Sequence, residues 1–212
     1  MEAFNQRVGA VLFGETGDHF GQAVALLART HRIAGMNDMF NARFWEPDFT
    51  PARSPVAVQT GASNLLAIVR PALRNLEDCR REARVNTHIL DAFLFGARRM
   101  EFMGQRMLDG LAAAQAYARA CESPAPLELL AQVEGYVRTN RDTYGALGKR
   151  FADLWLSENK PYALDWTLDR YRKAVHAQDV LLEKLAAARV SVAVGKSLPA
   201  PEDMGLAIPQ RR

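Results

Sequence analysis

The sequence has little of what several specialised protein classes need. It has two cysteines in 212 residues, Cys79 and Cys121. They are too few for a zinc cluster and too isolated for a disulfide framework, so we expect both to act as small apolar side chains. No run of about 18 uncharged apolar residues occurs, which disfavours a membrane span. Lys and Arg number 27 against 24 Asp and Glu, and they are scattered, so nucleic acid is not an expected partner.

Catalytic and cofactor motifs are absent from the sequence as well. A di-metal carboxylate site in a helical bundle needs Glu-x-x-His pairs, which put a carboxylate and an imidazole on one helix face, and this chain has none. It also lacks a Gly-rich phosphate loop, a Gly-x-Ser-x-Gly elbow and a dinucleotide fingerprint. Cys121 beside Glu122 has no histidine base near it in the sequence. The sequence therefore predicts no catalytic residue, no metal ligand and no cofactor, and His88 and His176 are expected at the surface or at helix ends.

Helical periodicity dominates what is present, and no segment alternates in the manner typical of a strand. Short helices are expected over residues 2–13, 18–30 and 36–49. The second has Asp18 as its N-cap. The third ends before Pro47, because the residue before a proline is pushed out of the helical region.

Four long helical stretches follow the short ones. Each spans about 30 residues, or roughly 45 Å, and their connections are only a few residues long. Long helices with short connections pack as antiparallel neighbours, so the predicted fold class is all-α: an antiparallel up-down bundle of about four long helices with additional short N-terminal helices. Pro71 removes one backbone hydrogen bond, which predicts a kink near residues 67–71. The stretches are 57–85, 87–120, 123–160 and 163–195.

The chain divides into three parts on this evidence. Residues 1–50 form a short helical segment that packs on the bundle, 51–197 form the bundle, and the Pro-rich residues 198–212 run extended. The opening, with Glu2 before a short apolar stretch, is not a secretory signal. It looks like a helix already in progress, so either the chain begins inside a longer protein or it opens with an ordinary N-terminal helix. A complete chain of this kind is expected in the cytoplasm.

The first candidate for binding is the segment FNARFWEPDF, residues 40–49. It gathers aromatic side chains around two acidic ones. Aromatic faces beside carboxylates suit sugars, whose C–H faces stack while their hydroxyls take hydrogen bonds, and this nominates Trp45 and Glu46. Aromatic side chains also anchor short helices in a core, and the anchor interpretation is favoured.

The second candidate is a group of charges inside the otherwise apolar stretch 87–120: Arg98, Arg99, Glu101 and Arg106. A functional interpretation has Arg98 and Glu101 facing a polar ligand or a neighbouring domain. The favoured interpretation is an intrahelical ion pair on a solvated face.

A third feature is the segment LWLSENKPYALDW, residues 154–166, which joins the last two long stretches. Its proline suits the first turn of the second helix, where a missing N–H costs nothing. We expect its three aromatic side chains to pack around the turn and to fix the angle between the helices. The structural junction comprises Trp155, Asn159, Pro161, Tyr162 and Trp166.

The same segment, extended to DLWLSENKPYALDWTLDRY, and the tail GKSLPAPEDMGL resemble the C-terminal helical region that follows the catalytic barrel in bacterial glycoside hydrolases of the β-N-acetylhexosaminidase type. In those proteins a tryptophan-bearing helix leads through an Asn-Lys/Arg-Pro step into another helix, and Trp155, Asn159, Lys160 and Pro161 match this pattern. The opening FNQRVGAVLFGETGDHFGQAVALL is similar to the helix just after such a barrel. Those enzymes use an Asp-Glu pair at a barrel strand end, but this chain has no Asp-Glu dipeptide and no barrel strand, so no catalytic residue carries over.

Three functions remain open on the sequence. The resemblance implies a helical accessory domain of a carbohydrate-active enzyme, which buttresses a catalytic domain of the same or a longer chain and lends aromatic side chains to its sugar site. Its expected partners are that catalytic domain and a carbohydrate. The alternative is a free-standing helical bundle acting as a protein-interaction or scaffold module. An enzyme in its own right needs a buried charged cluster, for which Arg98, Glu101 and Asp165 are the candidates.

Overall fold

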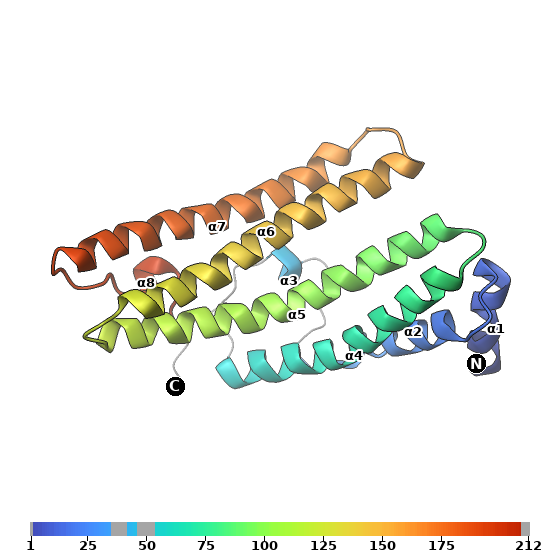
Figure 1. The fold of residues 1–212 in the computed structure, drawn as a ribbon, viewed down its shortest axis with the longest axis horizontal. Helices are drawn as coiled ribbons and strands as arrows, with labels where there is room; N and C mark the ends of the chain where they lie inside the picture. The colour runs from blue at the N-terminus through green and yellow to red at the C-terminus, as the bar shows by residue number, and fades with distance from the viewer. Residues whose placement is uncertain (1, 35–41, 46–53, 209–212) are drawn as a thin grey trace. The chain divides into compact units, whose positions relative to one another are not determined.

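The computed structural model describes residues 2–34, 42–45 and 54–208, which form helices and their connections without a strand (Figure 1). Four long helices follow short N-terminal ones in these ranges, so the predicted all-α fold class is confirmed. Across the same ranges, no helix has both the length and the apolar character needed to cross a membrane. The helices are α1 (Glu2–Phe13), α2 (His19–Leu27), the 3-10 helix η1 (Thr30–Arg32), α3 (Ala42–Trp45), α4 (Pro55–Glu82), α5 (Thr87–Glu122), α6 (Leu127–Glu158), α7 (Leu164–Ala193) and α8 (Pro201–Met204).

Local sequence signals account for the start of α4. Ser54 Oγ accepts the backbone N–H of Ala57 at 3.2 Å, and Pro55 takes the first helical position, where its missing N–H costs nothing. The helix then continues through Pro71 to Glu82. Of the third short helix expected from the sequence, only the four residues of α3 are described, and Pro47 lies outside the described residues.

The start of α2 differs in detail from the expectation. Asp18 stands directly before the helix, but its side chain makes no capping hydrogen bond. The buried carboxylate of Glu15 accepts the backbone N–H of Phe20 instead, at 3.1 Å. A residue outside the helix thus satisfies one of the N–H groups that a helix start leaves without a partner.

The chain forms two compact units, whose boundaries fall inside α4 and α5. Unit 1 comprises Met1–Phe44 and Gly61–Gln105, and unit 2 comprises Trp45–Thr60 and Arg106–Arg212. The sequence predicts other boundaries, near residues 50 and 197, because neither composition nor periodicity marks the point where a continuous helix passes from one set of neighbours to another.

Unit 1 is held by aromatic contacts and by a close helix approach. The rings of Phe13 and Phe20 meet edge to face at 4.8 Å, and Phe20 meets Phe93 in the same way at 5.0 Å. Gly104 of α5 lies against α4, where a Cβ atom would stand 3.0 Å from Cγ of Leu66. The absence of a side chain at Gly104 therefore sets how closely the two helices pack.

Glu82 ties the turn between α1 and α2 to the end of α4. Its Oε2 accepts the backbone N–H and the hydroxyl of Thr16, at 3.0 and 2.9 Å, and the backbone N–H of Gly17 at 3.0 Å. His19 Nε2 lies 3.4 Å from Oε1. The backbone N–H donors of Gly17 and Thr16 lower the pKa of Glu82 to about 2, because they favour the charged carboxylate.

Unit 2 is built on the antiparallel pair α6 and α7, which lie side by side (Figure 1). Gly148 of α6 makes room for Tyr171 of α7, since a Cβ atom there would stand 3.0 Å from Cβ of Tyr171. Arg141 and Asp179 connect the same two helices at 3.5 Å. The core also takes in the second part of α5 and the tail, with buried side chains that include Tyr117, Leu130, Val133, Leu185, Met204 and Leu206.

The tail packs more closely than the sequence suggests. It contains one helical turn, α8, and it buries Met204 and Leu206, which are 5% and 3% exposed. Tyr117 of α5 donates its hydroxyl to the carbonyl oxygen of Pro199 at 2.9 Å. The tail is therefore a part of the unit 2 core over its described length, and not only an extended strap.

Candidate functional site

Trp45, the aromatic residue nominated for sugar binding, lies in an aromatic and cationic cluster of unit 2. Its ring meets Tyr171 edge to face at 4.8 Å and stacks in parallel with Tyr144 at 6.4 Å. The guanidinium of Arg170 lies 4.6 Å from its ring centre. These contacts make Trp45 an anchor of α3, as the favoured interpretation expects. Glu46 lies outside the described residues.

Arg98 and Glu101 are near-surface residues of unit 1 that pair across helices. Arg98 Nη2 lies 3.2 Å from Glu77 Oε1, and Arg70 Nε lies 3.3 Å from Glu101 Oε1. Both partners belong to α4, whereas the sequence interpretation expected a pair within one helix. The side chains are exposed by 37% or more, so these pairs contribute little to stability.

Asp165, the third member of the proposed charged cluster, is 86% exposed and lies 3.9 Å from Arg172 Nη1 in unit 2. Arg98 and Glu101 belong to unit 1 and are largely solvated. None of the three side chains is buried. The structure therefore offers no support for an enzyme built on these three residues.

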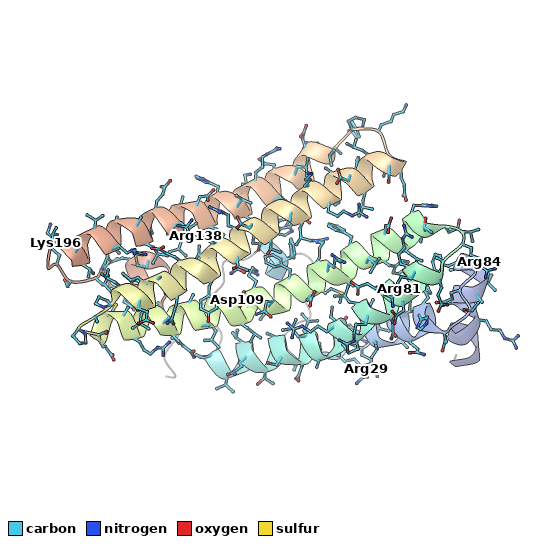
Figure 2. All side chains as sticks on the ribbon, in the orientation of Figure 1. Arg29, Arg81, Arg84, Asp109, Arg138 and Lys196 are labelled. Carbon is cyan, nitrogen blue, oxygen red and sulfur yellow. The ribbon has the colours of Figure 1, made fainter. Side chains whose placement is uncertain are left out.

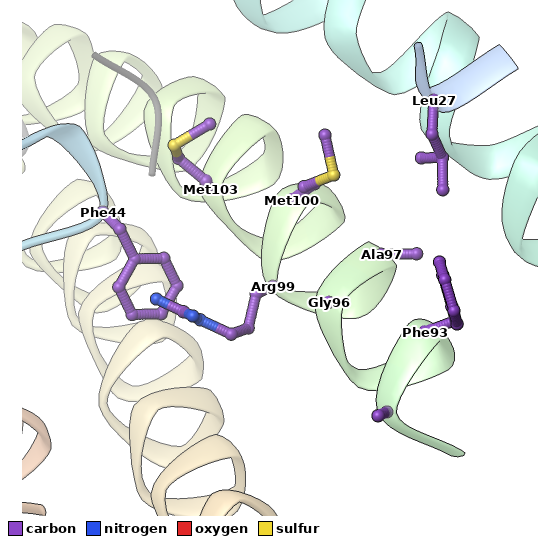
Figure 3. Close-up of a pocket in the computed structure, with 9 residues that line it drawn as sticks. Leu27, Phe44, Phe93, Gly96, Ala97, Arg99, Met100 and Met103 are labelled. Carbon is purple, nitrogen blue, oxygen red and sulfur yellow. The ribbon is translucent and has the colours of Figure 1, made fainter. Parts of the chain in front are cut away.

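Arg99 takes a different position from Arg98, beside an apolar pocket of unit 1 (Figure 3). The pocket has a volume of about 350 Å³. The Arg99 guanidinium lies across the ring of Phe44, 4.3 Å from its centre, and 5.9 Å from the ring of Phe95. The other lining side chains are apolar, from Leu27 and from the face of α5 that carries Met100. A single cation at the edge of an apolar hollow is the main polar feature of this pocket.

The junction between α6 and α7 is held at its base by hydrogen bonds. Asn159 N–H donates to the carbonyl of Trp155 at 2.8 Å and completes the last turn of α6. The indole Nε1 of Trp155 donates to the carbonyl of Lys160 at 2.9 Å, and Ala163 takes a left-handed conformation, with φ of 63°, before α7 begins. The carbonyl of Pro161 accepts the N–H of Leu164 at 3.1 Å. Pro161 therefore lies in the turn before α7, and not in the first helical turn, where the sequence placed it.

The other two aromatic residues of the junction face solvent. Tyr162 is 81% exposed and Trp166 is 75% exposed, with ring centres 6.5 Å apart. Leu156, on the last turn of α6, is 51% exposed. Trp155 thus closes the turn as expected, while Tyr162 and Trp166 do not pack around it. We call the three exposed side chains of Leu156, Tyr162 and Trp166 the junction surface.

The described residues contain no group of three or more His, Cys, Asp or Glu side chains placed to hold a metal ion. Cys79 is fully buried, and burial, followed by the neighbouring Glu15, raises the pKa of its thiol to about 12. A thiol with so high a pKa is a poor nucleophile, because the thiolate is the reactive form. Cys79 therefore has the structural character that the sequence predicts for it.

A cavity of about 400 Å³ in unit 2 is the feature that the sequence did not reveal. Trp45, Tyr144 and Gln178 are among its lining side chains, together with basic residues of α5 and α7. Arg106 was the single signal, as a cation inside an apolar helix face; it is 3% exposed. The remaining members come from helices far apart in sequence, which no spacing rule connects.

Comparison with known proteins gives no further constraint: no protein family, no curated protein and no solved structure matches this chain.

Proposed function

We propose that this chain is a helical accessory domain that docks against the catalytic domain of a carbohydrate-active enzyme through the junction surface. The observation that carries the proposal is the solvent-facing pair Tyr162 and Trp166, 81% and 75% exposed. This pair stands on the segment that resembles the C-terminal region of β-N-acetylhexosaminidase-type hydrolases. No residue of the described chain is assigned to catalysis.

The physical case rests on what such a surface does when it meets a partner. Trp and Tyr are the side chains that most often dominate the binding free energy of protein interfaces, since they bury much area at little cost in side-chain entropy. The turn beneath them is already ordered by the Trp155–Lys160 hydrogen bond. Docking therefore needs little reorganisation of this chain, which favours affinity.

The first test is the DNA around the coding sequence. We expect it to encode, in the same or an adjacent reading frame, a barrel domain with an Asp-Glu pair at a strand end. If no such barrel is encoded nearby, the proposal fails.

The second test uses that barrel domain, co-expressed with this chain and purified through a tag on the barrel. Tyr162→Ser combined with Trp166→Ser should abolish co-purification. The matched control is Val190→Ser, which removes an apolar side chain that is 66% exposed on α7 outside the junction. Equal recovery of the double variant and the control would show that the junction surface is not the docking site.

The free-standing interaction module remains the alternative, and it uses the same exposed surface on a separate partner or on a second copy of the chain. Size-exclusion chromatography with light scattering separates the two. A dimer that the double variant converts to a monomer would favour the alternative, whereas a monomer in both cases favours an accessory domain whose partner is absent from the sample.

A further inference from the structure

The cavity of unit 2 is lined by basic side chains, whereas the junction surface is made of apolar and aromatic ones. Its volume is about 400 Å³, within the range of small-molecule sites. The walls come from the end of α3, the second part of α5, α6, α7 and the turn after α8. Four cationic side chains line it: Arg106, Arg170, Lys173 and Lys184.

The described lining of this cavity is positively charged. Among the described residues that line it there is no Asp or Glu. Lys173 Nζ lies 2.7 Å from a carboxylate oxygen of Asp169, and Lys184 Nζ donates to the neutral backbone carbonyl of Asp203 at 2.9 Å. Asp109, labelled in Figure 2, is buried one turn along α5 from Arg106. Among the described residues, the lining therefore carries four cations and no carboxylate, with Asp169 paired to Lys173 at its edge, and this charge favours an anion.

Gln178 requires a hydrogen-bond donor from the ligand, in addition to the negative charge that the cations favour. It lines the cavity, is 9% exposed, and its Oε1 has no hydrogen-bond partner among the described residues. A buried acceptor without a donor is costly, so a ligand that donates a hydrogen bond there gains affinity. A ligand ammonium group would be repelled by the surrounding cations, so a neutral donor is required, and a hydroxyl is the simplest one.

Asn140 of α6 shows the same feature at the same level of unit 2. It is 2% exposed, and its Oδ1 also has no hydrogen-bond partner among the described residues. Asn140 and Gln178 each directly precede a member of the Arg141–Asp179 pair, which joins α6 to α7. Asn140 is not among the side chains that line the cavity, so the case for a polar ligand there is carried by Gln178.

The cationic and aromatic side chains are already ordered by one another. Arg170 lies over the ring of Trp45 at 4.6 Å, and the guanidinium of Arg106 lies 5.9 Å from the ring centre of Tyr144. Such contacts hold long side chains in place before a ligand arrives, which lowers the entropy cost of binding.

We propose that this cavity binds a hydroxylated organic anion of about monosaccharide size, whose phosphate or carboxylate meets the cationic side chains and whose hydroxyl donates to Gln178. The proposal stands on the cavity alone and does not depend on the junction surface or on a catalytic domain.

Isothermal titration calorimetry of the full chain tests this with three probes: glucose 6-phosphate, glucose and inorganic phosphate. Glucose 6-phosphate carries both groups that the cavity calls for, and each of the others carries one. We expect glucose 6-phosphate to bind, and glucose and inorganic phosphate to bind at least about tenfold more weakly.

Side-chain changes locate the binding. Lys173→Gln and Lys184→Gln should each weaken glucose 6-phosphate binding by about fivefold, the scale of one solvated charge contact. Both side chains reach solvent, and each makes one polar contact with the protein, so each change should cost little stability. Lys196→Gln is the control, because it removes the same charge from an exposed position in the turn after α7, outside the cavity lining (Figure 2). Gln178→Leu should weaken glucose 6-phosphate binding and leave inorganic phosphate binding unchanged.

Four results would overturn the proposal. Equal affinity for inorganic phosphate and glucose 6-phosphate would show that the cavity binds anions without recognising the sugar. Equal affinity for glucose and glucose 6-phosphate would show that the cations do not contribute to binding. Absence of binding by all three probes would show that the cavity does not take this class of ligand. Equal losses in Lys184→Gln and Lys196→Gln would show that general charge, and not the cavity, is responsible.

Discussion

Tyr117 offers a direct measurement of how firmly the tail is packed against α5. The side chain is fully buried and donates its hydroxyl to the carbonyl oxygen of Pro199 at 2.9 Å. Burial, with smaller effects from Cys121 and Asp203, raises its pKa to about 12. Both the hydrogen bond and the protonation of the hydroxyl therefore depend on the tail staying in place.

The sign and size of the pH effect follow from this pKa. In the unfolded chain a tyrosine titrates near pH 10. Between about pH 10 and 12 the unfolded state therefore loses this proton while the folded state keeps it, and this difference favours unfolding. The stabilisation that Tyr117 provides is complete below pH 10 and is lost as the pH rises through 12. A difference of about two pKa units corresponds to about 2.7 kcal/mol, of which about 1.4 kcal/mol is lost by pH 11.

Tyr117→Phe separates the two contributions. At pH 8 the variant should be less stable than the wild type by about 1 kcal/mol, because the Pro199 carbonyl loses its donor. The variant has no phenol to ionise, so its stability falls less with pH, and the two proteins should become equally stable near pH 11, where about 1.4 kcal/mol of the wild-type advantage is gone. Urea unfolding followed by circular dichroism at pH 8 to 11 measures this.

The control is Tyr162→Phe, at a tyrosine that is 81% exposed. It should change the free energy of unfolding by no more than about 0.5 kcal/mol. A difference between wild type and Tyr117→Phe that stays constant from pH 8 to 11 would refute the reasoning, since it would mean that the hydroxyl of Tyr117 reaches water in the folded state.

Three further predictions concern single residues. At pH 8 a thiol reagent should modify the exposed Cys121 in the folded protein. It should modify Cys79, whose pKa is about 12, only after urea is added. Modification of both thiols at one rate would contradict the burial of Cys79. Gln178→Leu should raise the free energy of unfolding by about 1 kcal/mol without ligand, because it removes a buried acceptor that lacks a donor; a loss in urea unfolding would show that the amide is satisfied. Glu82→Gln should lower the melting temperature at pH 7. The melting temperatures of variant and wild type should converge as the pH falls from about 4.5 toward 2, because the folded Glu82 takes up its proton there. A difference that persists at pH 2 would argue against the charged carboxylate as the cause.

The sequence was most informative about the long helices. Apolar positions recurring every three or four residues over 57–85 and 163–195, with short connections between stretches, are signals that act locally along the chain. They predicted the four long helices to within a few residues of the ends observed for α4, α5, α6 and α7. The fold class follows from these signals because long adjacent helices have few other ways to bury their apolar faces.

Local sequence signals could not predict which residues the surface charges pair with. Arg98 and Glu101 lie three residues apart on α5, so a pair within the helix was the natural expectation. Each instead meets a residue of α4, Glu77 and Arg70 respectively. The choice between the two depends on the rotation and register of α4 against α5, which side-chain packing decides.

The cavity of unit 2 was hidden for the same reason. Its cations come from α5 and α7, and Trp45 comes from a short helix before both. The sequence nominated Trp45 for its aromatic neighbours at positions 40–49, and among the described residues it also meets the rings of Tyr144 and Tyr171, which are far away in the sequence. The charged group that contains Arg106 was interpreted as an ion pair on a solvated face, whereas Arg106 is only 3% exposed.

Glycines inside helices were an unused signal for helix contacts. A glycine in a helix interior costs about 1 kcal/mol relative to alanine, so its presence calls for a reason. Gly104 lies in α5 and Gly148 in α6, and at each a Cβ atom would come within 3.0 Å of a side chain on the neighbouring helix. Gly96, Gly135 and Gly145 lie in the same two helices with nothing within 4 Å of such an atom. The glycine pattern therefore limits the places where helices can approach, and only the packed structure distinguishes the glycines that are required from those that are not.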